Sequence, residues 1–379
     1  MTKQKQPQYR FDGFEGEWEE KILGDVVSIN SGKDYKHLNS GNIPVYGTGG
    51  YMLSVDKSLA EQNGIGIGRK GTIDKPYILE APFWTVDTLF YCLPEKSQNL
   101  QFIFSIFQGI NWKKLDESTG VPSLSKQAIK KVNISTPSLP EQEAIGELFQ
   151  TVNQLIQLQD QRLTTLKEQK QTFLRKMFPA QGQKVPEIRL QDFDGEWEEK
   201  KLGEVGEIIT GSTPPTSDST LYDDIGIPWV TPTDIRNNIT FTSSKKLSKL
   251  GQSKAKIVPK NSILVTCIAS IGKNTLLSTV GSFNQQINAI VPLPNFSPYF
   301  LLTQSTFWSE KMEIIAGSAT MKIVNKTTFS NIKSIFPSFP EQVAIGDFFQ
   351  TLDQQISQTE EKLTELKALK QTLLNRLFV

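Results

Sequence analysis

The sequence predicts an α+β protein in which two mixed α/β modules are separated by two long helices that pair as an antiparallel coiled coil. The first observation is an internal pseudo-twofold repeat: residues 137–178 return 200 positions later as residues 337–378, with about half of the aligned positions identical. The second is that residues 8–25 recur as residues 187–204. Ungapped matches of this length mark a duplication, so the chain is built from two related halves.

The repeat sets the expected domain boundaries. We predict a first module at 1–137, a central helix at 138–179, a second module at 180–337 and a C-terminal helix at 338–379. Between the repeated ends, residues 26–136 and 205–336 share hardly any sequence, and the second stretch is longer by about 21 residues. Both contain short apolar runs interrupted by glycine, proline and asparagine. This pattern is typical of brief strands joined by tight turns.

Both long helices carry the same start signal. Ser138 and Glu141 match the Ser-x-x-Glu capping box, Ser338 and Glu341 repeat it, and each copy has a proline in the first turn. Pro179 is expected to end the first helix. A helix of about 38 residues is roughly 57 Å long at ~1.5 Å per residue.

The helices also share a heptad seam, because apolar residues recur in steps of three and four. The seam residues are Phe149, Val152, Ile156, Leu163, Leu166, Phe173 and Met177, and then Phe349, Leu352, Ile356, Leu363, Leu366, Leu373 and Leu377. Polar residues occupy the same two seam positions in both copies, Gln159 with Thr359 and Lys170 with Lys370. Polar seam residues lower stability and fix register. We therefore expect the helices to pair about a pseudo-twofold axis and to hold the modules at opposite ends of a rod.

Composition argues against several functional classes. Among 379 residues there is one histidine, His37, expected in a solvated loop, so catalytic schemes that need two imidazoles are excluded. Cys92 and Cys267 stand singly in apolar runs, which predicts buried thiols rather than a disulfide or a zinc site. The glycine-rich segments 47–50 and 64–71 fit no nucleotide-binding motif and are predicted to be tight turns. No catalytic residue and no metal site are expected.

No long apolar run and no signal peptide are evident, which places the chain in the cytoplasm with no membrane partner. The net charge of +1 is unevenly distributed. Residues 26–136 hold 12 Lys and Arg against 9 Asp and Glu, and residues 205–336 hold 12 against 7. Positive charge is therefore concentrated in the two variable stretches, as expected of modules that bind a polyanion.

The candidate DNA-binding residues are basic, amide and aromatic side chains expected on loops of these stretches. Lysine suits phosphate contacts, whereas Arg, Asn and Gln can read base edges. In the first module the candidates are Lys33, Lys36, Tyr46, Arg69, Lys70, Lys113 and Lys114, near Tyr35, Tyr51 and Trp112. In the second they are Arg236, Asn237, Lys245, Lys246, Lys254, Lys256, Lys273 and Gln285, near Asn238, Lys249 and Gln286.

The repeated segments GFEGEWEEKILGD and PSLPEQEAIGELFQ, with their second copies DFDGEWEEKKLGE and PSFPEQVAIGDFF, resemble those of the specificity subunits of type I restriction-modification systems. The resemblance covers essentially the whole chain. It implies that residues 1–137 and 180–337 are target recognition domains that each read one half of a split site in double-stranded DNA. It further implies that the two helices form a spacer and dock two modification (methyltransferase) subunits.

The same resemblance implies that catalysis belongs to partners. The modification subunits would use S-adenosylmethionine to methylate adenine, and restriction (endonuclease and translocase) subunits would use ATP and Mg²⁺; this chain would hold no cofactor and catalyse nothing by itself. Because the two variable stretches differ, we predict an asymmetric bipartite site whose halves lie somewhat more than one duplex turn apart, given ~34–36 Å per turn. The alternatives are a tandem-repeat protein-binding scaffold without DNA specificity and, less favoured, a stand-alone enzyme.

Overall fold

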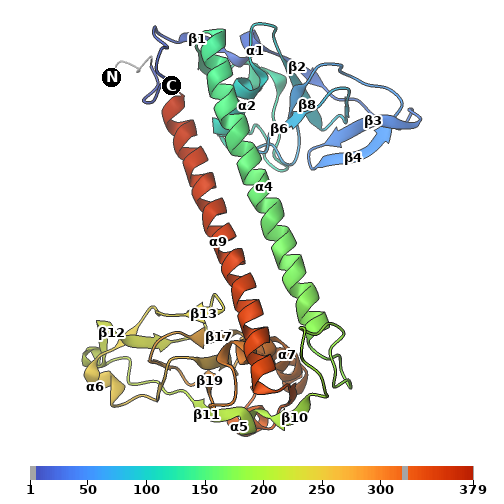
Figure 1. Ribbon diagram of the computed structural model, residues 1–379. Helices are drawn as coiled ribbons and strands as arrows, with labels where there is room; N and C mark the ends of the chain where they lie inside the picture. Colours follow the sequence, from blue (N-terminus) through green and yellow to red (C-terminus); the bar gives the residue numbers. More distant parts are fainter. Residues whose placement is uncertain (1–5, 318–322, 379) are drawn as a thin grey trace. The chain divides into compact units, whose positions relative to one another are not determined.

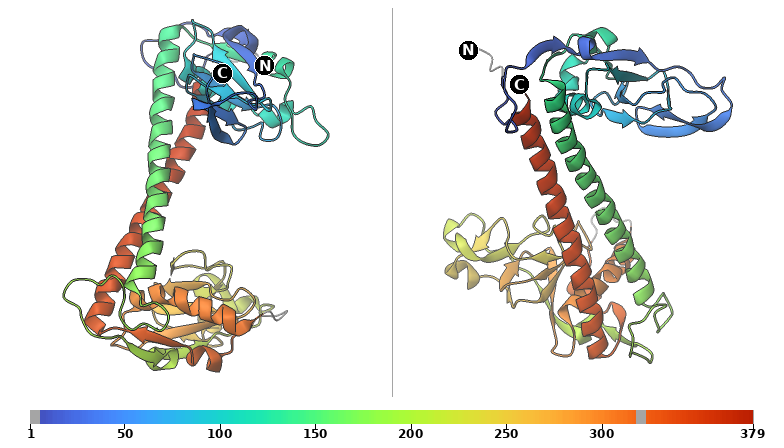
Figure 2. Two further views of the ribbon diagram at one scale, coloured as in Figure 1. Left: turned by 90° about the vertical axis from the view of Figure 1, so that its right-hand side faces the viewer. Right: turned by 45° about the horizontal axis from the view of Figure 1, so that its top comes forward.

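The structure is a computed structural model, which describes residues 6–317 and 323–378. The chain forms two compact units, Met1–Gln161 with Glu361–Val379, and Arg162–Glu360. Each long helix therefore contributes one part to each unit. Figures 1 and 2 show α4 and α9 as the two long helices of the chain.

The first unit contains three small sheets and the short helices that cover them. Two strands, β1 and β9, pair antiparallel; a four-stranded sheet has the order β2-β8-β5-β6; and a three-stranded sheet has the order β4-β3-β7. The strands are β1 Glu19–Ile22, β2 Val27–Ser31, β3 Ser40–Gly47, β4 Gly50–Val55, β5 Gly64–Gly68, β6 Tyr77–Leu79, β7 Trp84–Thr85, β8 Leu89–Pro94 and β9 Asn133–Thr136. The helices are α1 Leu23–Val26, α2 Leu100–Gly109, η1 Trp112–Leu115, α3 Lys126–Lys130 and the first part of α4 Leu139–Met177.

The second unit repeats this plan with additions. Its sheets have the orders β10-β20, β11-β19-β16-β17-β13 and β14-β12-β18-β15. The strands are β10 Glu198–Lys201, β11 Gly206–Thr210, β12 Tyr222–Val230, β13 Ile239–Thr240, β14 Lys246–Leu247, β15 Ile257–Val258, β16 Ser262–Thr266, β17 Asn274–Leu277, β18 Gly281–Phe283, β19 Ile287–Pro292 and β20 Lys333–Phe336. The helices are α5 Leu202–Val205, η2 Ser219–Leu221, α6 Lys249–Gln252, α7 Pro298–Ala316, α8 Lys326–Ser330 and the first part of α9 Phe339–Leu377.

Most of the extra length of the second variable stretch lies between β12 and β16. This connection holds β13, β14, α6 and β15, whereas in the first unit only β4 separates β3 from β5. In Figure 1, β12 and α6 lie at the end of the second unit away from α7. The longer connection therefore adds β14 and β15 to the sheet that contains β12, and adds β13 to the edge of the five-stranded sheet.

Each long helix has 39 residues, and both begin directly after the predicted serine cap. Gln142 N–H donates to the Ser138 carbonyl and Gln342 N–H to the Ser338 carbonyl, both at 3.0 Å. The residues of the predicted heptad seam are all buried or half-buried along α4 and α9. The observed helices therefore agree with the helix spans predicted from the sequence, and their burial follows the predicted steps of three and four.

The capping-box glutamates have partners far away in sequence. Glu141, 1% exposed, accepts hydrogen bonds of 2.7 Å from both Nε and NH2 of Arg10, and one of 3.3 Å from Trp18 Nε1. Glu341 accepts from Arg189 in the same way, at 2.9 and 2.7 Å. The repeated entry segments are thus held to the first turn of each helix by a buried bidentate ion pair.

Within each unit the two helices contact each other. In the first unit the rings of Phe149 on α4 and Phe378, next to the end of α9, are 5.7 Å apart. In the second, Phe173 and Phe348 are 5.0 Å apart, and the seam residue Lys170 forms an ion pair of 2.5 Å with Asp353. In both units a late segment of one helix meets an early segment of the other, which is the antiparallel arrangement.

One local prediction is wrong. Residues 64–71 were expected to form a tight turn, but Gly64–Gly68 forms the fully buried strand β5, and the turn follows at Gly71, where φ is +86°. The glycines of β5 are needed for packing: a Cβ on Gly68 would lie 2.0 Å from the Thr72 carbonyl oxygen. Glycine here marks close approach of backbones rather than a turn.

Candidate nucleic-acid interface

In the first unit, the loop that follows β7 organises three of the segments that carry candidate residues. Lys33 N–H donates to the Thr85 carbonyl at 2.8 Å, Val86 N–H to the Tyr46 carbonyl at 3.0 Å, and Arg69 N–H to the Thr88 carbonyl at 2.8 Å. The ends of β2, β3 and β5 are thereby fixed around one loop, and these three hydrogen bonds use backbone groups alone.

The second unit builds the same loop with unrelated residues. Ser212 N–H donates to the Phe283 carbonyl at 3.0 Å, Asn284 N–H to the Val230 carbonyl at 3.0 Å, and Cys267 N–H to the Gln286 carbonyl at 2.7 Å. The frame is therefore repeated while its side chains are exchanged, which is what a recognition surface with variable specificity requires.

A glycine ends the first strand of the frame in both units, and it is sterically required. A Cβ on Gly32 would lie 2.0 Å from the Val86 carbonyl oxygen, and a Cβ on Gly211 would lie 2.1 Å from the Asn284 carbonyl oxygen. Any larger residue at either position would push the loop away from the strand.

A buried tryptophan supports the residue after this glycine in each unit. Trp84 Nε1 donates to the Lys33 carbonyl at 2.9 Å, and Trp229 Nε1 donates to the Ser212 carbonyl at 3.0 Å. Trp84 lies on β7, whereas Trp229 lies on β12, which occupies the place of β3. The parallel pair β3 and β7 corresponds to the pair β12 and β18. The tryptophan that makes this hydrogen bond lies on the second strand of the pair in the first unit and on the first strand in the second unit.

Around the first loop, the structure gathers Lys33, Tyr46, Arg69 and Lys70. Three of the four side chains are exposed, and Tyr46 is half-buried. Tyr46 packs against Tyr51 and Tyr77, with ring centroids 6.5 and 6.1 Å apart, and its burial raises its pKa, so the phenol stays neutral. These residues offer cationic and hydroxyl donors beside an aromatic cluster, which is suitable for phosphate and base contacts.

Around the second loop, polar contacts connect four candidates with neighbouring residues. Gln285 accepts a hydrogen bond from Thr213, and Lys256 N–H donates to Ser212 Oγ at 3.0 Å. Lys273 Nζ donates to the Pro232 carbonyl at 3.3 Å, and Arg236 Nε donates to the Thr233 carbonyl at 3.1 Å. The threonine-rich loops at 213 and 231–233 are thus brought beside the predicted basic residues.

Other candidates lie in different surroundings. Lys113 is paired with Asp74 at 2.8 Å, and this hydrogen bond raises the pKa of Lys113. Lys245 lies over the Tyr222 ring at 5.4 Å, and Lys246 Nζ donates to the Asp224 carbonyl at 2.8 Å. Lys36, Lys114, Asn237 and Lys254 are exposed.

The expectation that Trp112 lies on the surface with the basic residues is wrong. Trp112 is 1% exposed, and its Nε1 donates to the Phe107 carbonyl at 2.8 Å. It packs against the Phe107 ring at 5.2 Å and belongs to the core of the first unit. His37 is exposed, as predicted for a loop residue, and its ring lies edge-on to that of Trp84.

Several residues of the two loops were not found by sequence reasoning, among them Thr213, Thr233, Asp234 and Asn284. The available signal was the Ser-Gly at 31–32 and the Thr-Gly at 210–211, which end the first strand of each variable stretch. Alignment of these two dipeptides would have pointed to Thr213, which follows them closely, but not to Thr233, Asp234 or Asn284, which lie in other segments.

Within residues 6–317 and 323–378, no group of three or more His, Cys, Asp or Glu side chains is placed to hold a metal ion. Both cysteines are buried, and burial raises the pKa of Cys267 to about 11 and that of Cys92 further. Thiols with such pKa values are poor nucleophiles. In the part of the chain that the structure describes, no helix is both long and apolar enough to span a bilayer.

Comparison with known proteins agrees with the repeated frame. Residues 15–168 and 194–368 each match the family described as type I restriction modification DNA specificity domain. The chain is 34% identical over 186 residues to the HindI specificity subunit of Haemophilus influenzae, an alignment that covers 46% of this chain and 39% of that protein. It is 27% identical over 197 residues to the MjaIX specificity subunit of Methanocaldococcus jannaschii, covering 48% and 44%. These alignments span less than half the length of the relatives.

Among solved structures, the specificity subunit of a type I restriction-modification system from M. genitalium superimposes with a TM-score of 0.74. The alignment covers 99% of both chains at 15% sequence identity, so it shows a common fold. The two family matches together cover most of the chain and coincide with its two repeats. This protein therefore belongs to the type I restriction modification DNA specificity family.

Proposed function

We propose that this chain is the DNA sequence-specificity subunit of a type I restriction-modification complex and that each unit reads one half of an asymmetric bipartite site. The observation that carries the proposal is the loop frame at 85–88 and 283–286. Its three backbone hydrogen bonds are repeated, whereas the side chains around it differ between the units. A fixed frame with different side chains would read different bases.

The partners follow from the same proposal. Two modification subunits dock on the helical parts of the chain, and α4 and α9 set the spacing between the half-sites. The modification subunits bring S-adenosylmethionine and transfer its methyl group to adenine. Restriction subunits bring ATP and Mg²⁺, and the complex acts on double-stranded DNA in the cytoplasm. This chain contributes binding energy and orientation, and no reacting group.

Methylome sequencing tests the proposal. A host that expresses this chain with its modification and restriction subunits is expected to carry methylated adenines in one bipartite motif whose halves differ in sequence. Replacing residues 26–136 with the corresponding stretch of another family member is expected to change one half of the motif only. Two identical halves, or a change in both halves after the exchange, would contradict the assignment of one half-site to each unit.

Salt dependence separates this function from that of a protein-binding scaffold. If Lys33, Arg69, Lys256 and Lys273 contact phosphates, DNA affinity must fall steeply with salt, because each neutralised phosphate releases counterions. Replacement of one such lysine by alanine is expected to lower the slope of log affinity against log salt by ~1. Absent or salt-independent DNA binding by the assembled complex would favour the scaffold.

A further inference from the structure

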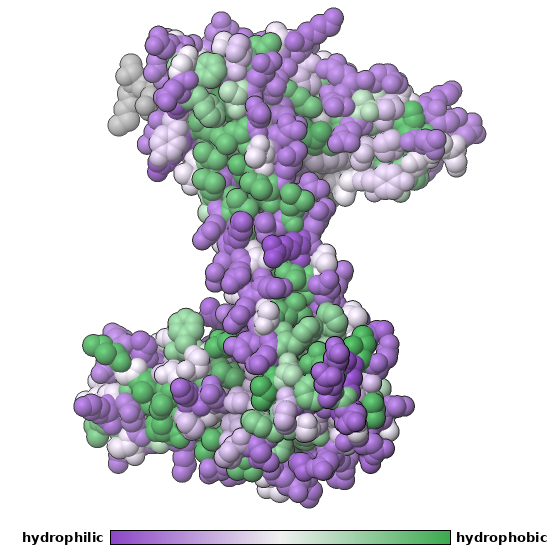
Figure 3. Space-filling view, in the orientation of Figure 1, coloured by the Kyte–Doolittle hydropathy of each residue, from purple (hydrophilic) through white to green (hydrophobic). Residues whose placement is uncertain are grey.

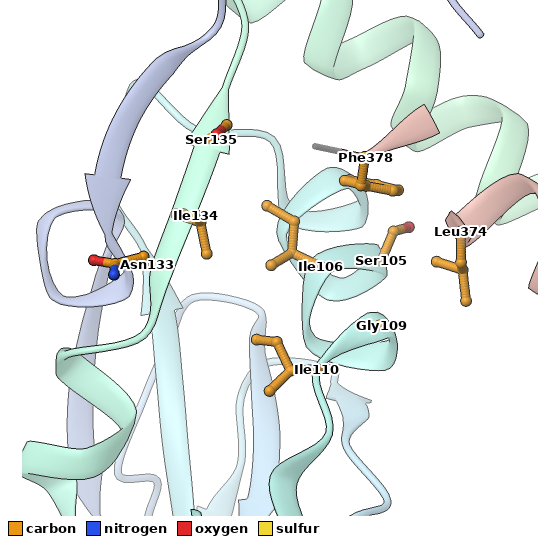
Figure 4. A pocket seen from close by; sticks show the side chains of 9 residues that line it. All are labelled: Ser105, Ile106, Gly109, Ile110, Asn133, Ile134, Ser135, Leu374 and Phe378. Carbon is orange, nitrogen blue, oxygen red and sulfur yellow. The ribbon is translucent and has the colours of Figure 1, made fainter. Parts of the chain in front are cut away.

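A pocket of about 250 Å³ opens in the first unit between α2, β9 and the end of α9 (Figure 4). Its apolar walls include Ile106 from α2, Ile110 directly after α2, Ile134 from β9, and Leu374 and Phe378 from the end of the chain. In Figure 4, Ile106, Ile110 and Ile134 lie between the strand and the helix, Leu374 and Phe378 lie beside α2 on the α9 side, and Gly109 leaves one wall without a side chain. The surface around this end of α4 and α9 is shown in Figure 3.

The internal repeat provides a second copy of this site for comparison. In the first unit the ring of Phe378 lies 5.5 Å from Phe102, 5.7 Å from Phe149 and 6.2 Å from Trp18. In the second unit an equivalent ring is surrounded in the same way.

There, Phe178 lies 5.5 Å from Phe300, 6.0 Å from Phe349 and 5.8 Å from Trp197. The helices α2 and α7 begin alike as well. The amides of the cap residues Asn99 and Ser297 donate to the side chains of Gln142 and Gln342, at 3.1 and 3.2 Å.

The two copies differ at the pocket. In the second unit, Phe307 lies 5.1 Å from the Phe178 ring and covers it. Gly109 of α2 is the position equivalent to Phe307 of α7. Each follows by four residues a hydroxyl residue, Ser105 or Thr303, whose side chain donates to the backbone carbonyl four residues before it. The first unit therefore lacks one benzyl side chain that the second unit supplies to itself.

The open strand edge beside the pocket differs too. On β20, the carbonyls of Ile335 and Lys333 accept hydrogen bonds from Gln304 and Lys311 of α7, at 2.5 and 2.6 Å. The corresponding carbonyls on β9 belong to Ser135 and Asn133. Among the residues that the structure describes, no side chain donates to either of them, because α2 ends at Gly109 and position 106 is an isoleucine.

We propose that a helix of the modification subunit docks here and places an aromatic side chain, of Phe or Tyr, in the pocket between α2, β9 and Phe378. In the second unit, one face of α7 fills the equivalent site with Gln304, Phe307 and Lys311. The docking helix would therefore carry a side-chain amide, an aromatic ring three residues later and an ammonium group seven residues after the amide. The ring fills the cavity while the polar groups pair with the strand carbonyls.

A polypeptide fits this site better than a small aromatic molecule, because the pocket is continuous with two backbone acceptors spaced along a strand edge. A buried aromatic anchor surrounded by such contacts is typical of an interface hot spot. The inference rests on the proposed function, which supplies the modification subunit. It also makes the two halves unequal, because the second unit has already filled its own pocket.

The first experiment examines the pocket alone and does not depend on the partner. Fluorobenzene is titrated against the full chain and followed by fluorine NMR. A 150 Å³ apolar cavity accommodates benzene, so the unaltered chain and Gly109→Ala are expected to bind the probe and Gly109→Phe is not. Phe307→Gly is expected to add a second binding site. Equal probe binding by Gly109→Ala and Gly109→Phe would overturn the assignment of the pocket.

The second experiment measures affinity for the purified modification subunit. A Cβ on Gly109 meets no atom within 4 Å, so Gly109→Ala is a control that keeps the pocket open. Gly109→Phe, with Gly109→Leu as a second filling variant, is expected to weaken one of the two binding events at least tenfold relative to Gly109→Ala. In native mass spectrometry the complex should shift from two modification subunits towards one.

The outcomes are separable. Equal affinity of Gly109→Ala and Gly109→Phe for the modification subunit refutes this inference and leaves the proposed function intact. Failure of the unaltered chain to bind the modification subunit refutes the proposed function as well. Self-association that is lost only in the filling variants would identify a second copy of this chain as the occupant and overturn the choice of partner.

Discussion

Replacing Arg10 by alanine should locally destabilise the first unit by about 3 kcal/mol, because breaking a buried ion pair costs about 3–5 kcal/mol. Arg10 makes two hydrogen bonds of 2.7 Å to Glu141, and it also donates to the carbonyls of Gly16 and Glu15 at 2.6 and 3.1 Å. Its side chain is 17% exposed, whereas that of Glu141 is 1% exposed. We take the lower end of the range because water reaches the arginine.

After the substitution the buried carboxylate would keep only the 3.3 Å contact from Trp18 among the bonds described for it. Hydrogen exchange measured by mass spectrometry reports the loss separately for each unit. A loss of 3 kcal/mol corresponds to exchange about 100-fold faster, at 1.4 kcal/mol per tenfold. The effect should appear in β1, β9 and the first turn of α4, because Glu141 lies in that turn and Trp18 precedes β1.

Three variants control this experiment. Arg189→Ala removes the equivalent pair with Glu341 and should act on β10 and β20 instead. Lys184→Ala removes an exposed pair with Glu196 and should change exchange very little. Arg10→Met with Glu141→Leu should recover most of the loss, because an apolar pair leaves no buried charge. Less than threefold faster exchange in Arg10→Ala, or equal effects on both units, would refute the reasoning.

Further predictions concern the polar seam, the buried thiol and the loop frame. Lys170→Met should destabilise the second unit by about 1–2 kcal/mol, because among the described residues Asp353 would keep Tyr299 as its one side-chain donor. Lys370→Met should instead stabilise the first unit. Burial lowers the pKa of Lys370, and the position that corresponds to Asp353 is Asn153, which carries no negative charge. If urea denaturation shows that both substitutions change the free energy of unfolding in the same direction, this prediction is wrong. Burial raises the pKa of Cys267 from 9.0 to about 11. The protonated thiol therefore contributes about 3 kcal/mol to the free energy of unfolding below pH 9, at 1.36 kcal/mol per pKa unit, and this contribution is lost as the pH rises to 11. Stability curves of the unaltered chain and Cys267→Ala that stay parallel between pH 9 and 11 would rule this out. Gly32→Ala should abolish recognition of one half-site and Gly211→Ala that of the other, since each Cβ would meet a carbonyl oxygen at about 2 Å; unchanged methylation in either variant would show that the loop frame is dispensable.

The sequence by itself determined the features that depend on local pattern and repetition. Capping residues placed the start of α4 and α9 at Ser138 and Ser338, and the steps of three and four identified their buried faces, because helix geometry relates neighbours in sequence to neighbours in space. The duplication likewise revealed two units with one plan, whereas the binding of a polyanion by the positively charged stretches stays a prediction.

Only the tertiary structure decided which distant residues meet. The partner of Glu141 is Arg10, 131 positions away, and no periodicity relates the two. The frame at 85–88 recurs at 283–286 through backbone bonds, and among its residues only the glycines at 32 and 211 are sterically required. Trp84 and Trp229 make the same hydrogen bond from different strands, so sequence alignment could not match them. The basic residues that flank these loops were predictable by type, but their grouping depends on strand pairing across the sheets.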